Sequence, residues 1–540
     1  MKTVKTVKTV EKLISVCSWL VLMVFLIDMG PVLPKALAKD LDLELIKVIQ
    51  IACTAPNTPP GCLNTWATSG PNQVSHDVES FDPSTQTIYV ADRVNKGATT
   101  IDTTTNTYIG TIPFPTNFPG AVGACTGSCP SGMLVAPDLH KLVMTDRGSR
   151  IAIINLRTGA AEAVLTATVG GTALAGTDEL DYDPLNHRAY VANTGSDTDT
   201  RFFLTVVDLV NDTIVDYIAL KILSGPHAGD TSSPEQPRFN PVDGFIYQNM
   251  PDLDEVWKID PTQSGGLGTS NAPIAARLTA HATGKICQPH GIDIDPVTNR
   301  ALLGCSNAGT TSFPQVLIDL STGNIVTTFD KAPVGGTDIE YFNNNLRRWY
   351  TASSNDFDSS SGCPSDGAGH FPVLGVFAAP GKFVEADCTA TNAHGMGVDP
   401  IHNNVYVGAR NTLTNTFPPN QAGVMVFHDP SKLAQTLEAG EETQANVNPL
   451  SGFRAKAKVR GESTHVSATV DELPFGATSA LLNITTTVGN EVVNCVLGGP
   501  DEATCTGTLH GDPLLGGEVI LAADGTPVAK GRITLRHGEH

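Results

Sequence analysis

The sequence has little charge and few aromatic residues for its length. Of 540 residues, 16% are charged and 6% are aromatic, and 34 Lys and Arg residues stand against 55 Asp and Glu residues. The net charge of -21 argues against nucleic acid or an anionic membrane surface as a partner, because both repel an acidic protein. The hydrophobic fraction of 41% excludes a disordered chain, and glycine without a three-residue period excludes collagen.

Long apolar runs are also lacking, with one exception near the N-terminus. Leu13–Ile27 is a largely apolar stretch of 15 residues, preceded by four lysines and followed by the small residues of Ala36–Ala38. This order is typical of a signal peptide, and the run is shorter than the roughly 20 residues of a membrane helix. We therefore expect residues 1–38 to direct export to a periplasm, the cell surface or the medium. No membrane span is expected after their removal.

The cysteines fall into neighbouring pairs. Removal of the signal leaves ten of the 11 cysteines, and an even number in an exported chain indicates disulfides. A thiolate metal site is the alternative, but the short Cys125–Cys129 segment lacks the second Cys or His pair that such a site needs. We expect five local disulfides: Cys53–Cys62, Cys125–Cys129, Cys287–Cys305, Cys363–Cys388 and Cys495–Cys505.

A phrase of about 50 residues recurs through the middle of the chain. Its first copy joins the corner Ser80-Phe-Asp-Pro83 to the β-rich run Ile88–Asp92 and to two further short runs. Seven such units, each of three or four short strands, predict a seven-bladed β-propeller over residues 70–435. A β-sandwich is the alternative, but it does not predict seven copies of one phrase. The corners lie at Asp82, Ala136, Asp183, Asn240, Asp295, Asn343 and Asp399.

Two segments resemble a known repeat family. Tyr190-Val-Ala-Asn193 and Ile101-Asp-Thr-Thr-Thr-Asn106 are similar to the YVTN-type extracellular β-propeller repeats, and the resemblance covers roughly residues 70–430. It implies the propeller fold. It does not imply one function, because that family includes surface-layer, binding and enzymatic proteins.

The remaining segments predict smaller units around the propeller. Residues 39–69 form an N-terminal extension, and its apolar stretch is expected to supply the outer strand that the seventh unit lacks. Residues 436–450 are polar and are interpreted as a linker. Residues 451–540 predict a small β-sandwich, because apolar and polar residues alternate in five runs. These runs are residues 455–459, 465–470, 480–488, 493–497 and 517–522.

One position of the repeat is rich in ionisable residues. In a propeller, equivalent points of the innermost strands circle the central channel, and strand starts lie near its mouth. The structural interpretation is that these are polar residues at strand starts, which form hydrogen bonds with neighbouring blades or with water. The position five residues before each corner is occupied by Asp77, Ser131, Asp178, Glu235, His290, Asp338 and His394.

The sharper interpretation is a metal site, because clustered carboxylates repel one another unless they are protonated or share a cation. We expect an arc of nitrogen and oxygen ligands suited to zinc, iron, manganese or copper, formed by His290, His394, Asp338, Asp77 and the adjacent His76. The glycine after each of the first two histidines is expected to let the backbone pass close to a ligand.

On the opposite side of the ring, acidic residues suit calcium or proton transfer. The candidate catalytic residues are Asp178, Glu179, Glu235 and Arg238, the last as an anion clamp or as an interblade salt bridge. Arg93 and Arg147 follow second strands and are expected to make solvated ion pairs.

Two functions follow from these patterns. The first is a metal-dependent lyase or hydrolase that acts on a small molecule. The second is a non-catalytic extracellular or cell-surface module that binds a small molecule or an envelope component. The sequence leaves the substrate, the identity of the metal, the oligomeric state and the role of the C-terminal domain open.

Overall fold

The computed structural model describes residues 43–51, 76–115, 130–196, 199–263, 273–280, 286–306, 315–330, 332–354, 359–365, 369–379, 381–409, 423–431, 442–449, 456–462, 465–471, 473, 477, 479–486, 489–498, 502–510, 518–523, 526–532 and 534–535. Within these ranges the chain is almost entirely strand, with two short 3-10 helices, η2 (Pro251–Leu253) and η3 (Ser359–Ser361). No helix of the described ranges is long and apolar enough to cross a bilayer.

The first copy of the repeated phrase forms one antiparallel meander. Its first strand ends at the corner residue Asp82, whose Oδ1 accepts a hydrogen bond of 2.9 Å from the N–H of Ser84. This side-chain bond closes the turn that the Asp-Pro corner predicts. The strands are β2 (His76–Asp82), β3 (Thr87–Asp92), β4 (Gly97–Asp102) and β5 (Thr107–Pro113).

The turn after each corner has the same backbone geometry in every copy. The residue four positions after the corner has a positive φ, between 51° and 75°, which residues other than glycine rarely adopt. The same uncommon geometry at equivalent places supports the repeat independently of residue identity. These residues are Gln86, His140, His187, Gly244, Asn299, Arg347 and Asn403.

Six further four-stranded antiparallel sheets lie within the described residues. The second sheet contains β6 (Pro130–Ala136), β7 (Lys141–Asp146), β8 (Arg150–Asn155) and β9 (Ala161–Thr166). The third contains β12 (Thr177–Asp183), β13 (Arg188–Asn193), β14 (Phe203–Asp208) and β15 (Thr213–Ala219). The fourth contains β16 (Pro237–Asn240), β17 (Phe245–Met250), β18 (Glu255–Ile259) and β19 (Ile274–Thr279).

The last three sheets follow in chain order. The fifth contains β20 (Pro289–Asp295), β21 (Arg300–Cys305), β22 (Val316–Asp319) and β23 (Asn324–Thr328). The sixth contains β24 (Thr337–Asn343), β25 (Arg348–Ser353), β26 (Val373–Ala378) and β27 (Lys382–Cys388). The seventh contains β28 (Met396–Asp399), β29 (Asn404–Ala409), β30 (Gly423–His428) and β1 (Glu44–Ile49). A two-stranded hairpin, β10 (Thr168–Val169) and β11 (Thr172–Ala173), is inserted between the second and third sheets.

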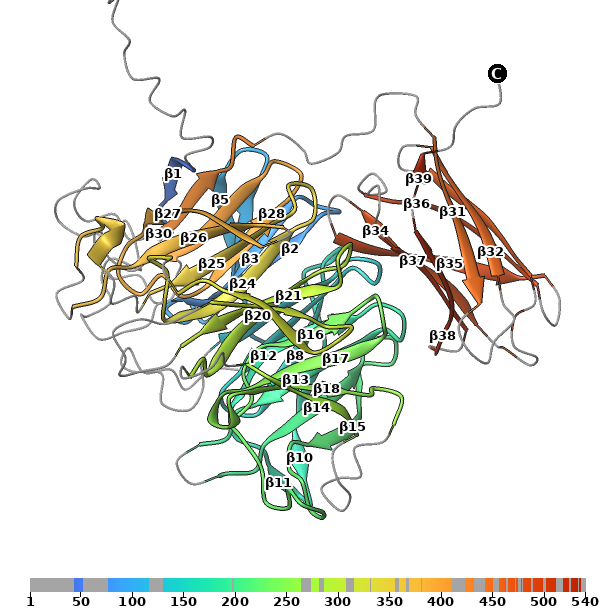
Figure 1. Ribbon diagram of the computed structural model, residues 1–540, viewed down its shortest axis with the longest axis horizontal. Helices are drawn as coiled ribbons and strands as arrows, with labels where there is room; N and C mark the ends of the chain where they lie inside the picture. Colours follow the sequence, from blue (N-terminus) through green and yellow to red (C-terminus); the bar gives the residue numbers. More distant parts are fainter. Residues whose placement is uncertain are drawn as a thin grey trace, which may run out of the picture. The chain divides into compact units, whose positions relative to one another are not determined.

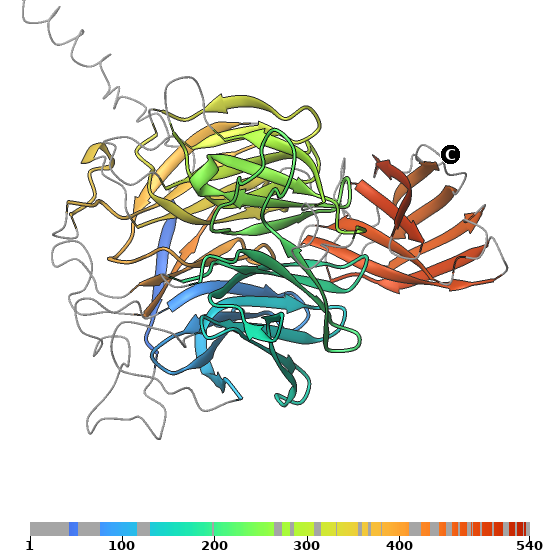
Figure 2. The same ribbon diagram turned by 90° about the horizontal axis from the view of Figure 1, so that it is seen from below.

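The N-terminal strand completes the last sheet, as the sequence predicts. Strand β1 pairs antiparallel with β30, so that chain segments almost 400 residues apart share one sheet. The first strands contact one another in order, from β2 through β6, β12, β16, β20 and β24 to β28, and β28 contacts β2. This closed cycle of contacts among all-β sheets is consistent with the predicted propeller (Figure 1, Figure 2).

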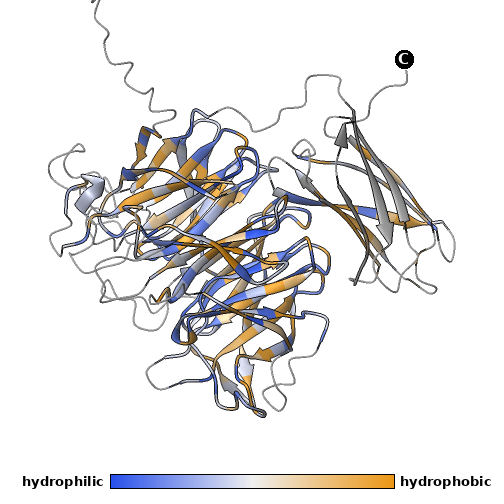
Figure 3. Ribbon diagram, viewed as in Figure 1, coloured by the Kyte–Doolittle hydropathy of each residue, from blue (hydrophilic) through white to orange (hydrophobic). Residues whose placement is uncertain are grey.

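The hydrophobic core lies between neighbouring sheets. Tyr89 and Ala91 of the first sheet pack with Met133, Leu142 and Met144 of the second in one buried cluster. Similar clusters join the later sheets, and hydrophobic residues run along the strands while the turns are polar (Figure 3). Burying apolar area at such interfaces is the main term that holds repeated sheets together.

The C-terminal strands form one antiparallel sheet of nine strands. The predicted sandwich of two sheets is not confirmed, because β31 pairs with both β32 and β38, so that the sheet closes on itself. Strand β31 also lies within the segment interpreted as a linker. The strands are β31 (Glu442–Pro449), β32 (Lys456–Glu462), β33 (His465–Asp471), β34 (Ala480–Thr486), β35 (Gly489–Leu497), β36 (Ala503–Thr508), β37 (Glu518–Ala523), β38 (Thr526–Arg532) and β39 (Thr534–Leu535).

Three of the five predicted disulfides are present. Cys287–Cys305 joins the segment before β20 to the end of β21, Cys363–Cys388 joins the connection between β25 and β26 to the end of β27, and Cys495–Cys505 joins β35 to β36. The pairs Cys53–Cys62 and Cys125–Cys129 lie outside the described residues, as does the predicted signal peptide at residues 1–38.

Candidate metal centre

The ionisable repeat position lies at the start of the first strand of each sheet. Asp77, Asp178 and Asp338 are the second residues of β2, β12 and β24, and Glu235 stands just before β16. Because the first strands contact one another in a closed order, their starts face one shared end of the sheets. The sequence pattern therefore gathers these residues at one place, and the side chains decide which of them meet.

Three of these side chains form a candidate metal centre. One ligand atom from each of Glu235, His290 and Asp338 lies within 4.8 Å of the other two. The Nδ1 atom of His290 lies 3.2 Å from Oδ1 of Asp338. All three residues are partly buried, and each comes from a different sheet. Two carboxylates and one imidazole are a donor set that suits zinc, manganese or iron.

The protonation of these three groups reflects their mutual contacts. Burial lowers the pKa of His290, but the charge of Glu235 and the hydrogen bond to Asp338 outweigh it and raise the value to about 9. Burial raises the pKa of Glu235 to about 7. Burial also opposes the ionisation of Asp338. The hydrogen bond to His290 and the charge of His394 outweigh this effect and hold the pKa of Asp338 below its usual value. A metal ion would have to displace the proton of His290.

His394, Asp77 and His76 gather in a separate cluster. The Nε2 atom of His394 lies 3.4 Å from Oδ1 of Asp77, and the His76 and His394 rings are 5.1 Å apart. Nδ1 of His394 lies 3.0 Å from the carbonyl oxygen of Asn392. Among the described residues this cluster does not meet the geometry of a three-ligand group. The structure thus joins two of the predicted ligands, His290 and Asp338, to Glu235 instead.

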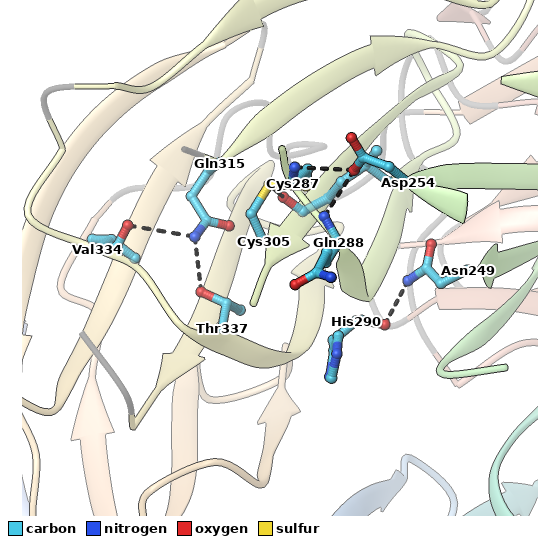
Figure 4. The surroundings of a disulfide bond; sticks show 10 residues. Asn249, Asp254, Cys287, Gln288, His290, Cys305, Gln315, Val334 and Thr337 are labelled. Atoms are coloured by element: carbon cyan, nitrogen blue, oxygen red, sulfur yellow. Dashed lines mark hydrogen bonds between the residues drawn. A yellow bond between two sulfur atoms is a disulfide. The ribbon is translucent and has the colours of Figure 1, made fainter. Parts of the chain in front are cut away.

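A disulfide and an aspartate hold the segment that carries His290 (Figure 4). Cys287 is bonded to Cys305 at the end of β21. Asp254 Oδ1 accepts hydrogen bonds from the N–H groups of Cys287 and Gln288, at 3.0 and 2.8 Å. These contacts fix the chain three residues before the imidazole, so they restrict where His290 can lie.

Two amide side chains of β17 hold the backbones of two candidate ligands, and the sequence patterns did not indicate this role. Gln248 Nε2 donates to the carbonyl oxygen of Glu235 at 2.6 Å, and Asn249 Nδ2 donates to that of His290 (Figure 4). Gln248 Oε1 and Asn249 Oδ1 are buried without a hydrogen-bond partner among the described residues. One sequence signal for this role was available. The tyrosine of the repeated phrase is followed by smaller residues in the other copies, but Tyr247 is followed by Gln248 and Asn249.

Arg93 and Arg147 bring positive charge to the carboxylates of the repeat position. The sequence predicted solvated ion pairs for both arginines. Arg93 is 7% exposed and pairs with Asp77, and its Nε donates to the Pro130 carbonyl oxygen at 3.1 Å. Burial and the charge of Arg147 lower the pKa of Arg93 to about 9. Arg147 Nη2 lies 3.1 Å from Oδ2 of Asp178. The prediction of solvated pairing is wrong for Arg93, because the guanidinium is buried beside the ring of carboxylates.

Glu179 is a buried carboxyl group that follows Asp178 in β12. Its side chain is 5% exposed, and its Oε2 atom has no hydrogen-bond partner within the described ranges. Burial, followed by the charges of Glu235, Asp338 and Asp178, raises its pKa well above the usual value. The raised pKa favours the protonated form of Glu179, so this side chain is a candidate proton donor.

Arg238 lies farther along the fourth sheet and is engaged on several sides. Its guanidinium pairs with Asp181 and Asp293, each at 3.2 Å, and lies over the Tyr341 ring at 4.7 Å. Nη2 also donates to the carbonyl oxygen of Glu340 at 3.2 Å. These partners come from the third, fifth and sixth sheets, so the contacts are those of the interblade salt bridge among the alternatives. Its role as an anion clamp stays a prediction.

The glycines after the repeated histidines serve contacts between sheets. A Cβ atom on Gly291 would lie 2.9 Å from the carbonyl oxygen of Asp338, and one on Gly395 would overlap that of Asp77. Gly132 approaches Asp178 in the same way. The backbone does pass close to another group at these glycines, as predicted, but that group is the backbone of the next sheet and not a ligand. Only glycine lets the candidate ligand strands lie this close.

Comparison of the sequence with protein-family models and with curated proteins finds no match. The resemblance to YVTN-type repeats therefore stays a prediction, and function has to be argued from the site.

Proposed function

We propose that the chain is an exported seven-bladed β-propeller with a small C-terminal β-domain, and that it holds a divalent metal ion at the mouth of the central channel. We further propose that the ion serves lyase or hydrolase chemistry on a small molecule. The observation that carries this proposal is the convergence of Glu235, His290 and Asp338 from three sheets within 4.8 Å. Seven four-stranded sheets with contacts in a closed order support the propeller.

Export is supported by the disulfides. Three bonded pairs occur in three different parts of the fold, and such bonds persist in oxidising compartments outside the cytosol. Together with the predicted signal at residues 1–38, they favour a periplasmic or extracellular location.

The residues of the site would have two kinds of role, metal binding and proton transfer. Glu235, His290 and Asp338 would hold the ion, which supplies a Lewis acid that polarises a substrate oxygen. Glu179, buried and with a raised pKa, would hold a proton for a leaving group or a developing anion. Asp178, paired with Arg147, is the adjacent carboxylate that would accept a proton. A lyase and a hydrolase both need this combination of polarisation and proton transfer.

Metal titration of the purified full chain tests the proposal. After removal of bound ions with a chelator, calorimetry with Zn²⁺ or Mn²⁺ should show one site per chain. Asp338→Asn should weaken binding at least about tenfold, because it removes a charged ligand. Glu44→Gln, an exposed carboxylate in β1, is the matched control and should bind as the wild type does. Equal binding by Asp338→Asn, or none by the wild type, would reject the site.

Turnover separates the enzyme from the alternative function. Hydrolysis of lactone and aryl-ester probes that follows metal content, and falls in Glu179→Gln, would support the enzyme. The alternative is a non-catalytic binding module, and the ion pairs of Arg93 and Arg147 favour it, because they neutralise two carboxylates of the ring without a metal. Metal binding without turnover of any probe would favour this alternative.

A further inference from the structure

Arg147 differs from its counterpart in the first sheet. Arg93 and Arg147 both follow the second strand of their sheets, and both pair with a carboxylate of the ring. The Arg93 side chain is 7% exposed, whereas that of Arg147 is 47% exposed. Among the described residues, the only side-chain hydrogen bond of Arg147 is the 3.1 Å contact from Nη2 to Asp178. Most of its five N–H donors therefore remain available to a ligand.

The Arg147 guanidinium is held at the end of the sheets that carries the candidate metal centre, because it pairs at 3.1 Å with Asp178, which occupies the same position of the repeat as Glu235 and Asp338. The charge of Asp178, followed by those of Glu235, Asp338 and Glu179, raises the pKa of Arg147 against the effect of burial. Glu235 and Asp338 belong to the fourth and sixth sheets, while Arg147 belongs to the second. The same end of the sheets thus holds a three-ligand cluster and a half-exposed guanidinium.

We propose that the small molecule bound at this site carries a carboxylate, with one oxygen on the metal ion and the other on the guanidinium of Arg147. This inference rests on the proposed metal site and names the chemical class of its ligand. A guanidinium presents parallel N–H donors that match the two oxygens of a planar carboxylate. The metal centre and Arg147 would therefore fix both the position and the orientation of the ligand.

The acidic residues at this end of the sheets favour a singly charged anion. The carboxyl groups of Asp178 and Asp338 lie there, so a doubly charged phosphate would meet stronger repulsion than a carboxylate even after the metal ion is bound. A cationic ligand would be repelled by Arg147 and by the ion. Without the ion, the carboxylates would repel the carboxylate as well. Binding of the anion should therefore require the metal, and by linkage the anion should tighten metal binding by the same factor.

Paramagnetic broadening measures this directly on the full chain loaded with Mn²⁺. Propionate is the probe, and its uncharged analogue propionamide is the ligand control. We expect broadening of the propionate protons by the loaded protein, none by the metal-free protein, and at least tenfold weaker broadening of propionamide at equal concentration. Equal broadening of the two probes would overturn the proposal.

Variants assign the effect to the guanidinium. Arg147→Gln should weaken propionate binding about 10-fold or more and leave Mn²⁺ binding without propionate intact. Arg147→Lys, which keeps the charge but not the fork, should fall between. Arg157→Gln, an exposed arginine of the same sheet, is the control and should match the wild type.

The outcomes distinguish this inference from the proposed function. If the wild type and both Arg147 variants bind Mn²⁺ normally and the variants bind propionate as the wild type does, the carboxylate site is rejected. The proposed metal site is then still supported. Failure of the wild type to bind Mn²⁺ rejects both.

Discussion

At the residue scale, burial sets the protonation of several carboxyl groups in the sheets. Glu79 and Glu340 occupy equivalent positions in β2 and β24, and burial raises the pKa of each well above its usual value. The corner residue Asp183 is buried too, and its pKa rises to about 6 although the N–H groups of Leu185 and Asn186 donate to it. Such groups keep a proton at pH values where the unfolded chain has lost it.

Asp183 therefore predicts a pH dependence of stability. Its folded pKa of about 6 exceeds the unfolded value of 3.8, so its contribution is complete below pH 3.8 and is lost as the pH rises through 6. Asp183→Asn should remove this loss. The difference in unfolding free energy between wild type and variant should change by about 2.4 kcal/mol between pH 4 and pH 7, as measured by urea denaturation.

Asp208→Asn is the matched control with the opposite sign. Asp208 closes an equivalent turn at the surface, where hydrogen bonds from Asn211 and Val210 outweigh burial and lower its pKa. Its contribution is present above the unfolded pKa and is lost as the pH falls. The same sign of pH dependence in both variants would contradict this account.

At the element scale, close backbone contacts and one distant strand hold the sheets together. Gly291 lets β20 approach β24, and the two ligand residues His290 and Asp338 lie directly at this contact. Strand β1 closes the seventh sheet by pairing with β30. Both features connect the order of the sheets to the geometry of the candidate centre.

Gly291→Ala should disturb the centre without removing a ligand. A Cβ atom at this position would lie 2.9 Å from the carbonyl oxygen of Asp338, so β24 must shift. We expect metal affinity to fall about 10-fold, as for other changes to groups that support ligands. Gly110→Ala, where a Cβ atom meets nothing within 4 Å, should retain the wild-type affinity in the same calorimetric titration. Unchanged affinity in Gly291→Ala would argue against coupling between this contact and the site.

Removing apolar contacts of β1 tests its structural role. Ile49 is 4% exposed and pairs with Val424, whereas Ile46 in the same strand is 46% exposed. Ile49→Ala should lower the free energy of unfolding by about 2–4 kcal/mol, and Ile46→Ala by less than about 0.5 kcal/mol. Thermal denaturation of both variants compares them. Similar losses would mean that β1 is not held by its inner face.

Much of this element order follows from sequence pattern. The Asp-Pro corners and the apolar stretch near Leu45 indicated the sheets and the closing strand, because turn chemistry and alternation are local signals. Strand β36 and the pairing partners of β31 could not be predicted in this way. Their register depends on which distant strands bury their faces together, and no local motif encodes that choice.

At the scale of the whole molecule, the described disulfides each reinforce one sheet. Cys287–Cys305 lies beside the candidate centre, whereas Cys495–Cys505 joins the paired strands β35 and β36 of the C-terminal sheet. The C-terminal strands bury a cluster that includes Val466, Leu482 and Leu521. Stability and metal binding should therefore respond separately to the two bonds.

Replacing Cys495 and Cys505 by serine tests this separation. The bond closes a loop of 10 residues, so its loss should cost about 2–3 kcal/mol of stability in the C-terminal sheet. Metal affinity at 25 °C should stay unchanged. The matched variant without Cys287 and Cys305 should lose metal affinity, because the His290 segment is released. A loss of affinity in the first variant would contradict the separation.

The candidate site was predictable only in part. The repeat position identified His290 and Asp338, because rotational equivalence places equivalent residues at one end of the sheets. It could not show that His394 turns towards Asp77 or that Glu235 joins the centre, since seven equivalent positions lie at the same end of the sheets and side-chain contacts select among them. Arg93 and Arg147 were misjudged because sequence does not reveal how far a residue after the second strand reaches.

Anomalous X-ray diffraction from crystals of the full chain loaded with Zn²⁺ tests the central claim most directly. The account predicts one dominant peak at about 2.0–2.2 Å from a carboxylate oxygen of Glu235, a carboxylate oxygen of Asp338 and a nitrogen of His290. A dominant peak between His394 and Asp77, or no peak near either cluster at saturating Zn²⁺, would contradict it.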